Sequence, residues 1–341
     1  MRTFKCPVCL TTTSVIRHAK RGTSIRYKCK TCSKYFSIRT IHHDRKTLLS
    51  DHLDGLSFRK LARKYGISAM TAWRICEEEL KKLPDNNEFT FQYCSRFSST
   101  FVFDGKFFTV KGYKHNLVLL WGIDYFRHDI PVFILAPYEN YQGWAKYFSY
   151  FRIISHHPQL LVCDDNPNLK MAARNSFPQV RIQTCFNHFK ESIRRNLKVR
   201  SDSTYKPFMN RIEHIFAQKL DDDVFNKQLF AIYRDYGADP LCLSTLTYIE
   251  KYKTELLAYR GVKASPVTTN LMESYNSHLE SRLFSIKCFN SFSYAKLWMN
   301  AYILKRRFTK FTDCEGKFRS LNGRFGVDLT KKQEIVLPTL F

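Results

Sequence analysis

The spacing of apolar residues changes along the chain, and each change predicts a different kind of structure. Over 57–80 apolar residues recur at helical spacing, which predicts two short helices. Over 101–136 there are three apolar, β-rich runs of strand length with short turns between them, which predict three consecutive antiparallel strands. From about 190 to 262 the pattern is amphipathic and helical again. We therefore expect an α+β protein with several domains.

The order of elements after the three strands narrows the fold class. The pattern predicts a helix over about 138–154, a short apolar strand over 159–163, a helix over 168–177 and a strand over 180–185. Three antiparallel strands followed by helix, parallel strand, helix and strand is the order of an RNase H-like domain. The helical stretch 190–262 is then interpreted as an insertion into that α/β domain.

The two helices predicted over 57–80 are separated by a short turn. Ser57 and Ser68 can each cap a helix, and Gly66 ends the first one. Helix, glycine-containing turn, helix is the helix-turn-helix pattern, in which the second helix enters the major groove of DNA. A plain pair of helices used for packing or dimerisation is the alternative. On the DNA-binding interpretation, the base-facing positions are Ala69, Met70, Thr71 and Arg74.

Four of the eleven cysteines form two matched pairs near the N-terminus. They give the pattern C-x2-C, nineteen residues, C-x2-C, which suits tetrahedral sulfur coordination of a structural Zn²⁺. Redox-active or unpaired cysteines are the alternative. We expect a basic zinc ribbon whose ligands are Cys6, Cys9, Cys29 and Cys32.

These patterns divide the chain into a series of expected domains. The zinc ribbon is followed by a helix-turn-helix domain, a polar linker, the catalytic core in two parts around the helical insertion, and a basic tail. The expected boundaries are 1–40 for the ribbon, 41–83 for the helix-turn-helix domain, 84–98 for the linker, 99–189 and 263–310 for the core, 190–262 for the insertion and 311–341 for the tail.

The charge of the chain points to a polyanionic partner. Lysine and arginine number 55 against 30 aspartate and glutamate, giving a formal net charge of +25. Such an excess favours nucleic acid, because neutralised phosphates release condensed counterions. Arg194, Arg195 and Lys198 would reach phosphates, although a solvated basic helix face has the same pattern. We see no export signal and no apolar stretch as long as a membrane span, so we expect a cytoplasmic protein without a membrane partner.

Three carboxylates stand where divalent ions would be needed. Asp104 is expected at the end of the first core strand, Asp164 at the end of the fourth, and Glu273 one turn into a later helix. If the strands are neighbours, the two aspartates face each other, and hard cations such as Mg²⁺ relieve such repulsion. Three acids with two Mg²⁺ or Mn²⁺ ions support phosphodiester chemistry.

Each acid also has a purely structural explanation. Asp104 and Gly105 form a dipeptide typical of a type I′ hairpin. Asp164 or its neighbour Asp165 could cap the next helix. Asn270 to Glu273 fits a capping box. The choice between Asp164 and Asp165 as the second carboxylate stays open.

Taken together, these motifs resemble the DDE transposases of bacterial insertion sequences, in the Mutator-like superfamily. The resemblance covers nearly the whole chain, and the joint set of motifs is specific. One departure is Asp165, where members of the family often have glycine. The matching residues are Asp104-Gly105, Glu139, Trp144, Asp164, Pro178, Cys185, His188, Asn270, Glu273 and Asn276.

The resemblance implies a function, partners and cofactors. A protein of this kind binds the terminal inverted repeats of its element, cuts the 3′ ends and joins them to target DNA, with double-stranded DNA as its substrate and no small-molecule substrate. It implies Asp104, Asp164 and Glu273 as catalytic ligands of two Mg²⁺ ions, and a homodimer that holds two ends. Cys185 and His188 could bind a metal, but two ligands alone do not make a metal site. We therefore expect them to pack and hydrogen-bond near the active site.

Two other functions fit parts of the sequence. A DNA-binding regulator with a catalytically inactive core would keep the ribbon and the helix-turn-helix, although the presence of all three acids speaks against it. A related nuclease that cuts without strand transfer would keep all three acids.

Overall fold

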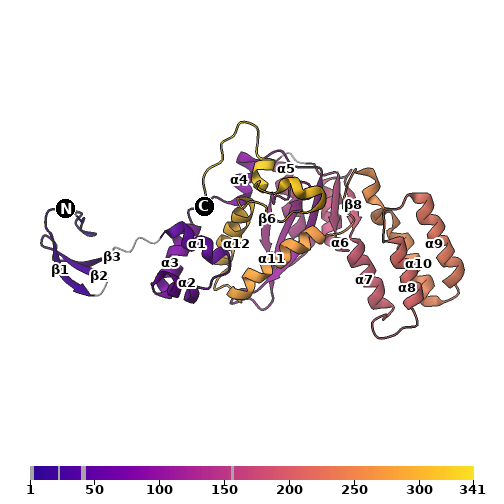
Figure 1. Cartoon of the computed structure of the whole chain (residues 1–341), viewed down its shortest axis with the longest axis horizontal. Coiled ribbons are helices and arrows are strands. Elements are labelled where there is room, and N and C mark those ends of the chain that lie inside the picture. Colours follow the sequence, from indigo (N-terminus) through magenta and orange to yellow (C-terminus); the bar gives the residue numbers. More distant parts are fainter. Residues whose placement is uncertain (1–3, 22–23, 40–43, 155–156) are drawn as a thin grey trace. The chain divides into compact units, whose positions relative to one another are not determined.

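The computed structural model describes residues 4–21, 24–39, 44–154 and 157–341. The chain divides into two compact units, residues 1–48 and 49–341, which we describe separately. Helix α1 (Arg45–Leu53) crosses this boundary. The prediction of a mixed α+β protein is confirmed, because the described residues form a three-stranded sheet, a five-stranded sheet and a series of helices (Figure 1).

The first unit is a small antiparallel sheet. Its strands β1 (Val15–Arg21), β2 (Ser24–Cys29) and β3 (Tyr35–Arg39) pair in sequence order. A unit of this size buries little apolar surface, and domains this small usually need a metal or disulfides to be stable. The four predicted zinc ligands lie before β1 and around the β2–β3 turn.

The second unit begins with helices that carry clear end signals. Ser57 accepts a hydrogen bond from the backbone of Lys60 before α2 (Phe58–Tyr65), and Gly66 ends α2 in the left-handed region at φ 62°. Ser68 caps α3 (Ala69–Leu80) in the same way. The next helix, α4 (Asn86–Tyr93), lies within the segment expected as a linker. The predicted helix, turn and helix are therefore present, with Gly66 in the turn.

The five-stranded sheet is the centre of the second unit. Its order is β6-β5-β4-β7-β8, with β4, β5 and β6 antiparallel and β4, β7 and β8 parallel. The predicted strands are all present: β4 (Thr100–Phe108), β5 (Leu117–Asp124), β6 (Phe133–Ala136), β7 (Leu160–Cys163) and β8 (Arg181–Thr184). One detail of the prediction is wrong: β4 does not end at Asp104, because β5 continues to pair with it up to Phe108.

Helices cover both faces of the sheet. Helices α5 (Tyr141–Ile153) and α6 (Pro167–Ser176) pack on the face that carries Phe101 and Phe103. Gly122 on β5 makes room for the Phe103 ring, because an added Cβ would lie 2.3 Å from it. Helix α11 (Asn270–Ile286) packs on the opposite face, where its Tyr275 contacts the Trp121 ring.

The predicted insertion is helical and has its own core. It contains α7 (Phe186–Asn196), α8 (Lys206–Ile215), α9 (Asp222–Tyr236) and α10 (Pro240–Leu256), of which α8, α9 and α10 lie side by side (Figure 1). A short 3-10 turn (Ala258–Gly261) leads back toward α11. Ile193, Phe208, Ile212, Phe225 and Leu246 belong to one buried cluster inside this bundle.

The C-terminal segment is tied to the core by one buried arginine. Arg307 of α12 (Phe292–Arg307) donates two hydrogen bonds to Asp129, at 2.8 and 2.9 Å, and others to Asn86 and Thr90 of α4. The hydroxyl of Thr330, in α13 (Gly326–Thr330), also donates to Asp129. Before α13 lies a 3-10 turn (Gly316–Leu321). The ends of the second unit are thus held against the loop between β5 and β6.

Candidate active site

Two neighbouring parallel strands bring Asp104 and Asp164 together. β4 and β7 pair in register up to Val102 and Val162, and each aspartate follows two residues later. Residues two apart on a strand point to the same face, so both carboxylates lie on the α11 side where β4 and β7 stop pairing. The hairpin explanation of Asp104 is wrong, because Asp104 and Gly105 both lie inside β4.

Burial and like charge raise the pKa values of these acids. Burial, and then the charge of Asp164, raises the pKa of Asp104 to about 6. Burial also raises the pKa of Asp164. Among the described residues, no lysine or arginine lies within ion-pair distance of either carboxylate. Burial and like charge therefore outweigh the favourable charge of His188, and the two aspartates form a site where negative charge is costly.

A fourth acid, Glu139, joins this site and was not among the predicted catalytic residues. Burial, and then the charges of Asp164 and Asp104, raises the pKa of Glu139 to about 7. Its Oε1 accepts a hydrogen bond of 3.2 Å from Nε1 of Trp144. Gly105 leaves room for this carboxylate, since an added Cβ would lie 2.8 Å from Glu139 Oε2. The sequence signal was the acid five residues before Trp144, which is one of the residues that carry the family resemblance.

Asn276 connects α11 to β4. Its Nδ2 donates to Asp104 Oδ2 at 2.6 Å, and its Oδ1 accepts from Trp121 Nε1 at 3.2 Å. The amide is held from both ends, so it orients Asp104 and leaves no freedom for the amide to flip. This places the predicted near-site residue Asn276 in direct contact with a predicted catalytic aspartate.

Glu273 lies at the start of α11, in a cluster with Cys185 and His188. One ligand atom from each of these three residues lies within 4.8 Å of the other two. A hydrogen bond to Cys185, and then the charges of Cys185, Glu273 and Asp164, raise the pKa of His188 to about 9, and its charge also acts on Asp104. His188 is thus the electrostatic link between Glu273 and the two aspartates.

Asp104 and Asp164 interact with each other, and Glu273 interacts with His188, but the three predicted acids do not form one tight set. The oxygens of Asp104, Asp164 and Glu273 are not a group within 4.8 Å among the described residues. Two metal ions in such sites lie about 3.5–4 Å apart, so ligands on opposite sides of the pair are farther from each other than that. The donor set consists of hard carboxylate oxygens whose negative charge is costly, and such a set fits Mg²⁺ or Mn²⁺.

Asp165 is directed to a different set of partners. Its Oδ1 accepts a 2.5 Å hydrogen bond from the buried ammonium of Lys170, and its Oδ2 accepts one of 3.1 Å from Tyr248 of α10. The same ammonium pairs with Glu255. Neither Asp164 nor Asp165 caps α6, because Asn166 does. The structure therefore gives the neighbouring aspartates different surroundings.

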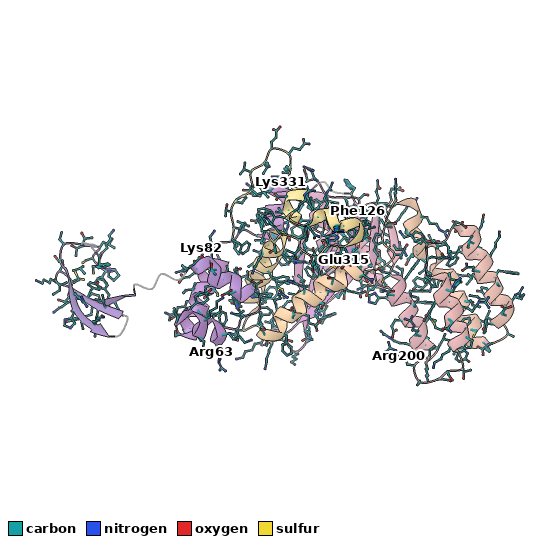
Figure 2. All side chains as sticks on the ribbon, in the orientation of Figure 1. Arg63, Lys82, Phe126, Arg200, Glu315 and Lys331 are labelled. Atoms are coloured by element: carbon teal, nitrogen blue, oxygen red, sulfur yellow. The ribbon has the colours of Figure 1, made fainter. Side chains whose placement is uncertain are left out.

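The remaining predicted residues have other partners or are exposed. Asn270 accepts a hydrogen bond from Asn187. Arg194 pairs with Glu213 and Glu191, and Arg195 pairs with Glu191, as does Arg200 beyond the C-terminal end of α7 (Figure 2). Met70 and Arg74 are exposed on α3, while Ala69 and Thr71 are partly buried.

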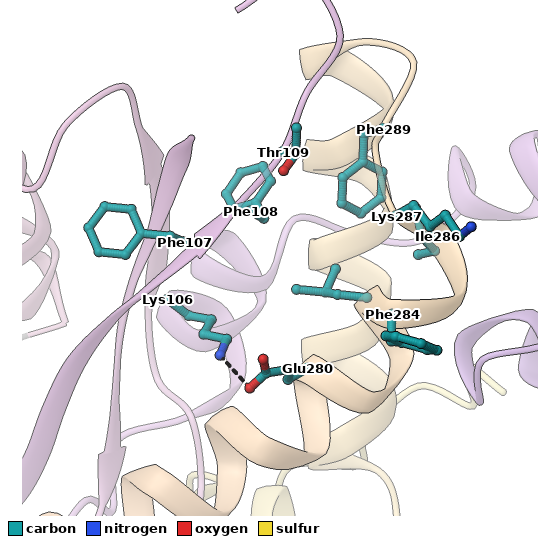
Figure 3. Close-up of a pocket in the computed structure, with 10 residues that line it drawn as sticks. Lys106, Phe107, Phe108, Thr109, Glu280, Phe284, Ile286, Lys287 and Phe289 are labelled. Atoms are coloured by element: carbon teal, nitrogen blue, oxygen red, sulfur yellow. Dashed lines mark hydrogen bonds and ion pairs between the residues drawn. The ribbon is translucent and has the colours of Figure 1, made fainter. Parts of the chain in front are cut away.

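A separate pocket lies between the C-terminal half of β4 and the C-terminal half of α11. It has a volume of about 290 Å³, and the ion pair between Lys106 and Glu280, 2.8 Å long, crosses it (Figure 3). Lys106 follows Asp104 on the same face of β4. Phe284 on its rim is 81% exposed. β4 and α11 are therefore linked at two points, by Asn276 with Asp104 and by Lys106 with Glu280, and we call the space along them the crevice.

The cysteines of the first unit form a second candidate metal centre. The Sγ atoms of Cys6 and Cys32 are 3.5 Å apart, as are those of Cys9 and Cys29, and all four lie within 4.8 Å of one another. Four sulfurs around one Zn²⁺ at about 2.3 Å would be about 3.8 Å apart. A hydrogen bond from the backbone of Cys32 lowers the pKa of Cys29 to about 6. The cluster can bind a structural zinc ion.

Comparison with known proteins identifies the class. Residues 126–300 match the family described as "Transposase, Mutator family". The match covers more than half of the chain, so this protein belongs to the Mutator family of transposases. The matched region includes Asp164, Cys185, His188 and Glu273, and it begins after Asp104.

The similarity to a solved structure is weaker than the match to the family. A cryo-EM structure of the simian T-cell lymphotropic virus intasome in complex with PP2A regulatory subunit B56 gamma is similar over 60% of this chain and 67% of that chain, with 14% sequence identity and a TM-score of 0.23. No curated protein matches. Among the described residues, no helix is long and apolar enough to cross a membrane.

Proposed function

We propose that this chain is a metal-dependent DNA transposase that cleaves the ends of its element and joins them to target DNA. The observation that carries the proposal is the site formed by Asp104 and Asp164. Glu139 and His188 interact with these aspartates, and His188 also interacts with Glu273. The membership of the Mutator family and the net charge of +25 support it.

In this proposal each residue has a distinct task. Asp104, Asp164 and Glu273 would hold two Mg²⁺ ions, which would help to activate the attacking hydroxyl and to stabilise the leaving oxygen. Asn276 fixes the orientation of Asp104. His188 carries a proton at neutral pH, so it places positive charge beside the acids, where a phosphate of the DNA would lie. Glu139 adds a further carboxylate whose charge must be neutralised by metal or by a proton.

The domains around this site would serve DNA binding. We propose an RNase H-like core, because helices cover both faces of a five-stranded mixed sheet with acids at the edge of its central strands. The zinc ribbon and the helix-turn-helix with Met70 and Arg74 would bind the element ends, and two subunits would hold two ends. The domain boundaries stay predictions, and so does a cytoplasmic location. The catalytically inactive regulator remains the competing function.

The test is cleavage and joining of DNA fragments from the borders of the element. With Mg²⁺, Asp104→Asn, Asp164→Asn and Glu273→Gln should each lower the rate by about 100-fold or more, as expected for loss of transition-state electrostatics. Asp165→Asn is the matched control and should stay active. A wild-type protein that binds these fragments but never cuts them would support the regulator instead.

A further inference from the structure

The hydroxyl of Thr269 lies at the centre of the cluster that contains Glu273. Thr269 is 1% exposed. Its Oγ1 is 2.9 Å from Glu273 Oε1, 3.3 Å from His188 Nδ1 and 3.2 Å from Cys185 Sγ. One small group therefore contacts all three members of the cluster, and it comes from the residue immediately before α11.

The chemistry of a hydroxyl decides how these contacts are used. A threonine hydroxyl has one hydrogen to donate and two lone pairs to accept with. Glu273 Oε1 is nearer than Cys185 Sγ and belongs to a carboxylate, so it is the preferred acceptor of that hydrogen. A lone pair then accepts from Nδ1–H of His188. Cys185 Sγ still receives the backbone N–H of Thr269 at 3.3 Å.

The position of Thr269 makes this use of the hydroxyl unusual. A threonine before a helix ordinarily accepts a hydrogen bond from the first turn of that helix. Thr269 makes no such bond to α11, and Cys185 makes none to α7. Instead the two helix starts bind each other, and the backbone N–H of Phe186 also donates to Val267 O at 2.9 Å. Both α7 and α11 therefore lack a side-chain capping bond at the point where the two ends of the helical insertion meet.

We propose that Thr269 is a positioning residue for the metal site, with Cys185 and His188 as its anchors. It holds Oε1 of Glu273, so the position of the carboxylate beside His188 is fixed before metal arrives. This gives the Cys185 and His188 motif a task that does not require it to bind an ion. The inference rests on the proposed function, because it assumes that Glu273 is a metal ligand.

Binding of Mn²⁺ to the full chain without DNA tests the inference. Electron paramagnetic resonance of free Mn²⁺ gives the dissociation constant, and urea unfolding without metal gives the stability. Thr269→Val removes only the hydroxyl and should weaken Mn²⁺ binding by about 10-fold, the effect typical of losing a group that orients a ligand. Thr269→Ser should restore it to within about 3-fold, since serine keeps the hydroxyl.

Thr245→Val is the matched control. It removes another buried threonine hydroxyl, which donates to the Leu241 carbonyl inside α10, and it should leave Mn²⁺ affinity unchanged. Normal Mn²⁺ affinity in Thr269→Val, with or without lower stability, would overturn the inference. If wild type and Glu273→Gln bind Mn²⁺ equally, the assignment of Glu273 in the proposed function fails instead. The two failures are thus distinct.

Discussion

The cysteine cluster of the first unit and the carboxylate crevice of the second differ in what a metal ion does for each. The cysteines belong to a unit with little apolar core, and all four ligand positions come from protein. The free energy of zinc binding there would contribute directly to folding, because the unfolded chain has no preformed site. The carboxylates lie on a large sheet covered by helices, which needs no metal to be compact. Their metal would relieve a repulsion that the fold already tolerates.

This difference separates stability from chemistry. A filled S₄ site has no open coordination position and no reaction to perform. Acids with raised pKa values destabilise the fold when they are ionised, and such groups are concentrated at functional sites. Each centre therefore predicts an opposite response when its ligands are removed: the first unit should unfold, whereas the second should become more stable and inactive.

The largest expected effect is loss of the first unit on removal of zinc. Structural zinc contributes about 10–16 kcal/mol of apparent binding free energy at pH 7 in small zinc domains, far more than a sheet of this size can replace. Cys29→Ser, or a strong chelator, should abolish amide hydrogen-exchange protection in β1–β3. The second unit should keep its protection and its unfolding transition.

The exposed Cys288 provides the control for that experiment. Cys288→Ser changes the same atom type outside the cluster and should leave zinc content and exchange protection unchanged. If β1–β3 stay protected in Cys29→Ser, the first unit is stable without zinc, and the contrast between the two centres would be lost.

The two centres also differ in how far the sequence could predict them. The cysteine spacing is local, so Cys6, Cys9, Cys29 and Cys32 could be assigned from the sequence alone. Asp104 and Asp164 meet through strand pairing, which the order of predicted elements suggested. The predicted end of β4 was wrong because β5 continues to pair with β4 after β7 stops. The periodicity of one strand carries no information about the length of its partner.

Other features of the crevice could be predicted only in part. Glu139 was noted as a family motif, but its approach to β4 depends on the missing side chain at Gly105, and a sequence pattern does not show that the two residues are close in space. The different surroundings of Asp164 and Asp165 depend on Lys170 and Tyr248, which come from different helices. Sequence patterns show which faces are buried, but not which of two adjacent acids a distant side chain will hold.

The second expected effect is a pH-dependent gain of stability in Asp104→Asn. The pKa of Asp104 is raised from 3.8 to about 6, so between these values the folded protein binds a proton that the unfolded chain has released. The free energy of unfolding of the wild type therefore falls as pH rises through this window. Without metal, Asp104→Asn should match the wild type near pH 4 and be about 2–3 kcal/mol more stable at pH 8.

The difference between the two proteins is the quantity to measure, by urea unfolding at each pH. Burial lowers the pKa values of His52, His128 and His278 to about 4, and these groups change stability in the opposite direction in both proteins. Mn²⁺ should remove the advantage of the variant at pH 8, because only the wild type keeps the ligand. A difference that does not vary with pH would show that Asp104 is not held in a repulsive site.

The smallest expected effect distinguishes the two adjacent aspartates within the crevice. Asp165→Asn leaves Lys170 paired with Glu255 at 2.5 Å and keeps an oxygen for Lys170 and Tyr248. Its cost should be about 1 kcal/mol, the usual net worth of one hydrogen bond, and its effect on Mn²⁺ affinity should be absent. Asp164→Asn should show the reverse: little or no loss of stability, because a repelled charge is removed, and clearly weaker Mn²⁺ binding. Urea unfolding and Mn²⁺ titration of the two variants side by side measure both quantities. If Asp165→Asn is the variant that loses Mn²⁺, the second metal ligand is Asp165, and its bonds to Lys170 and Tyr248 must break when metal binds.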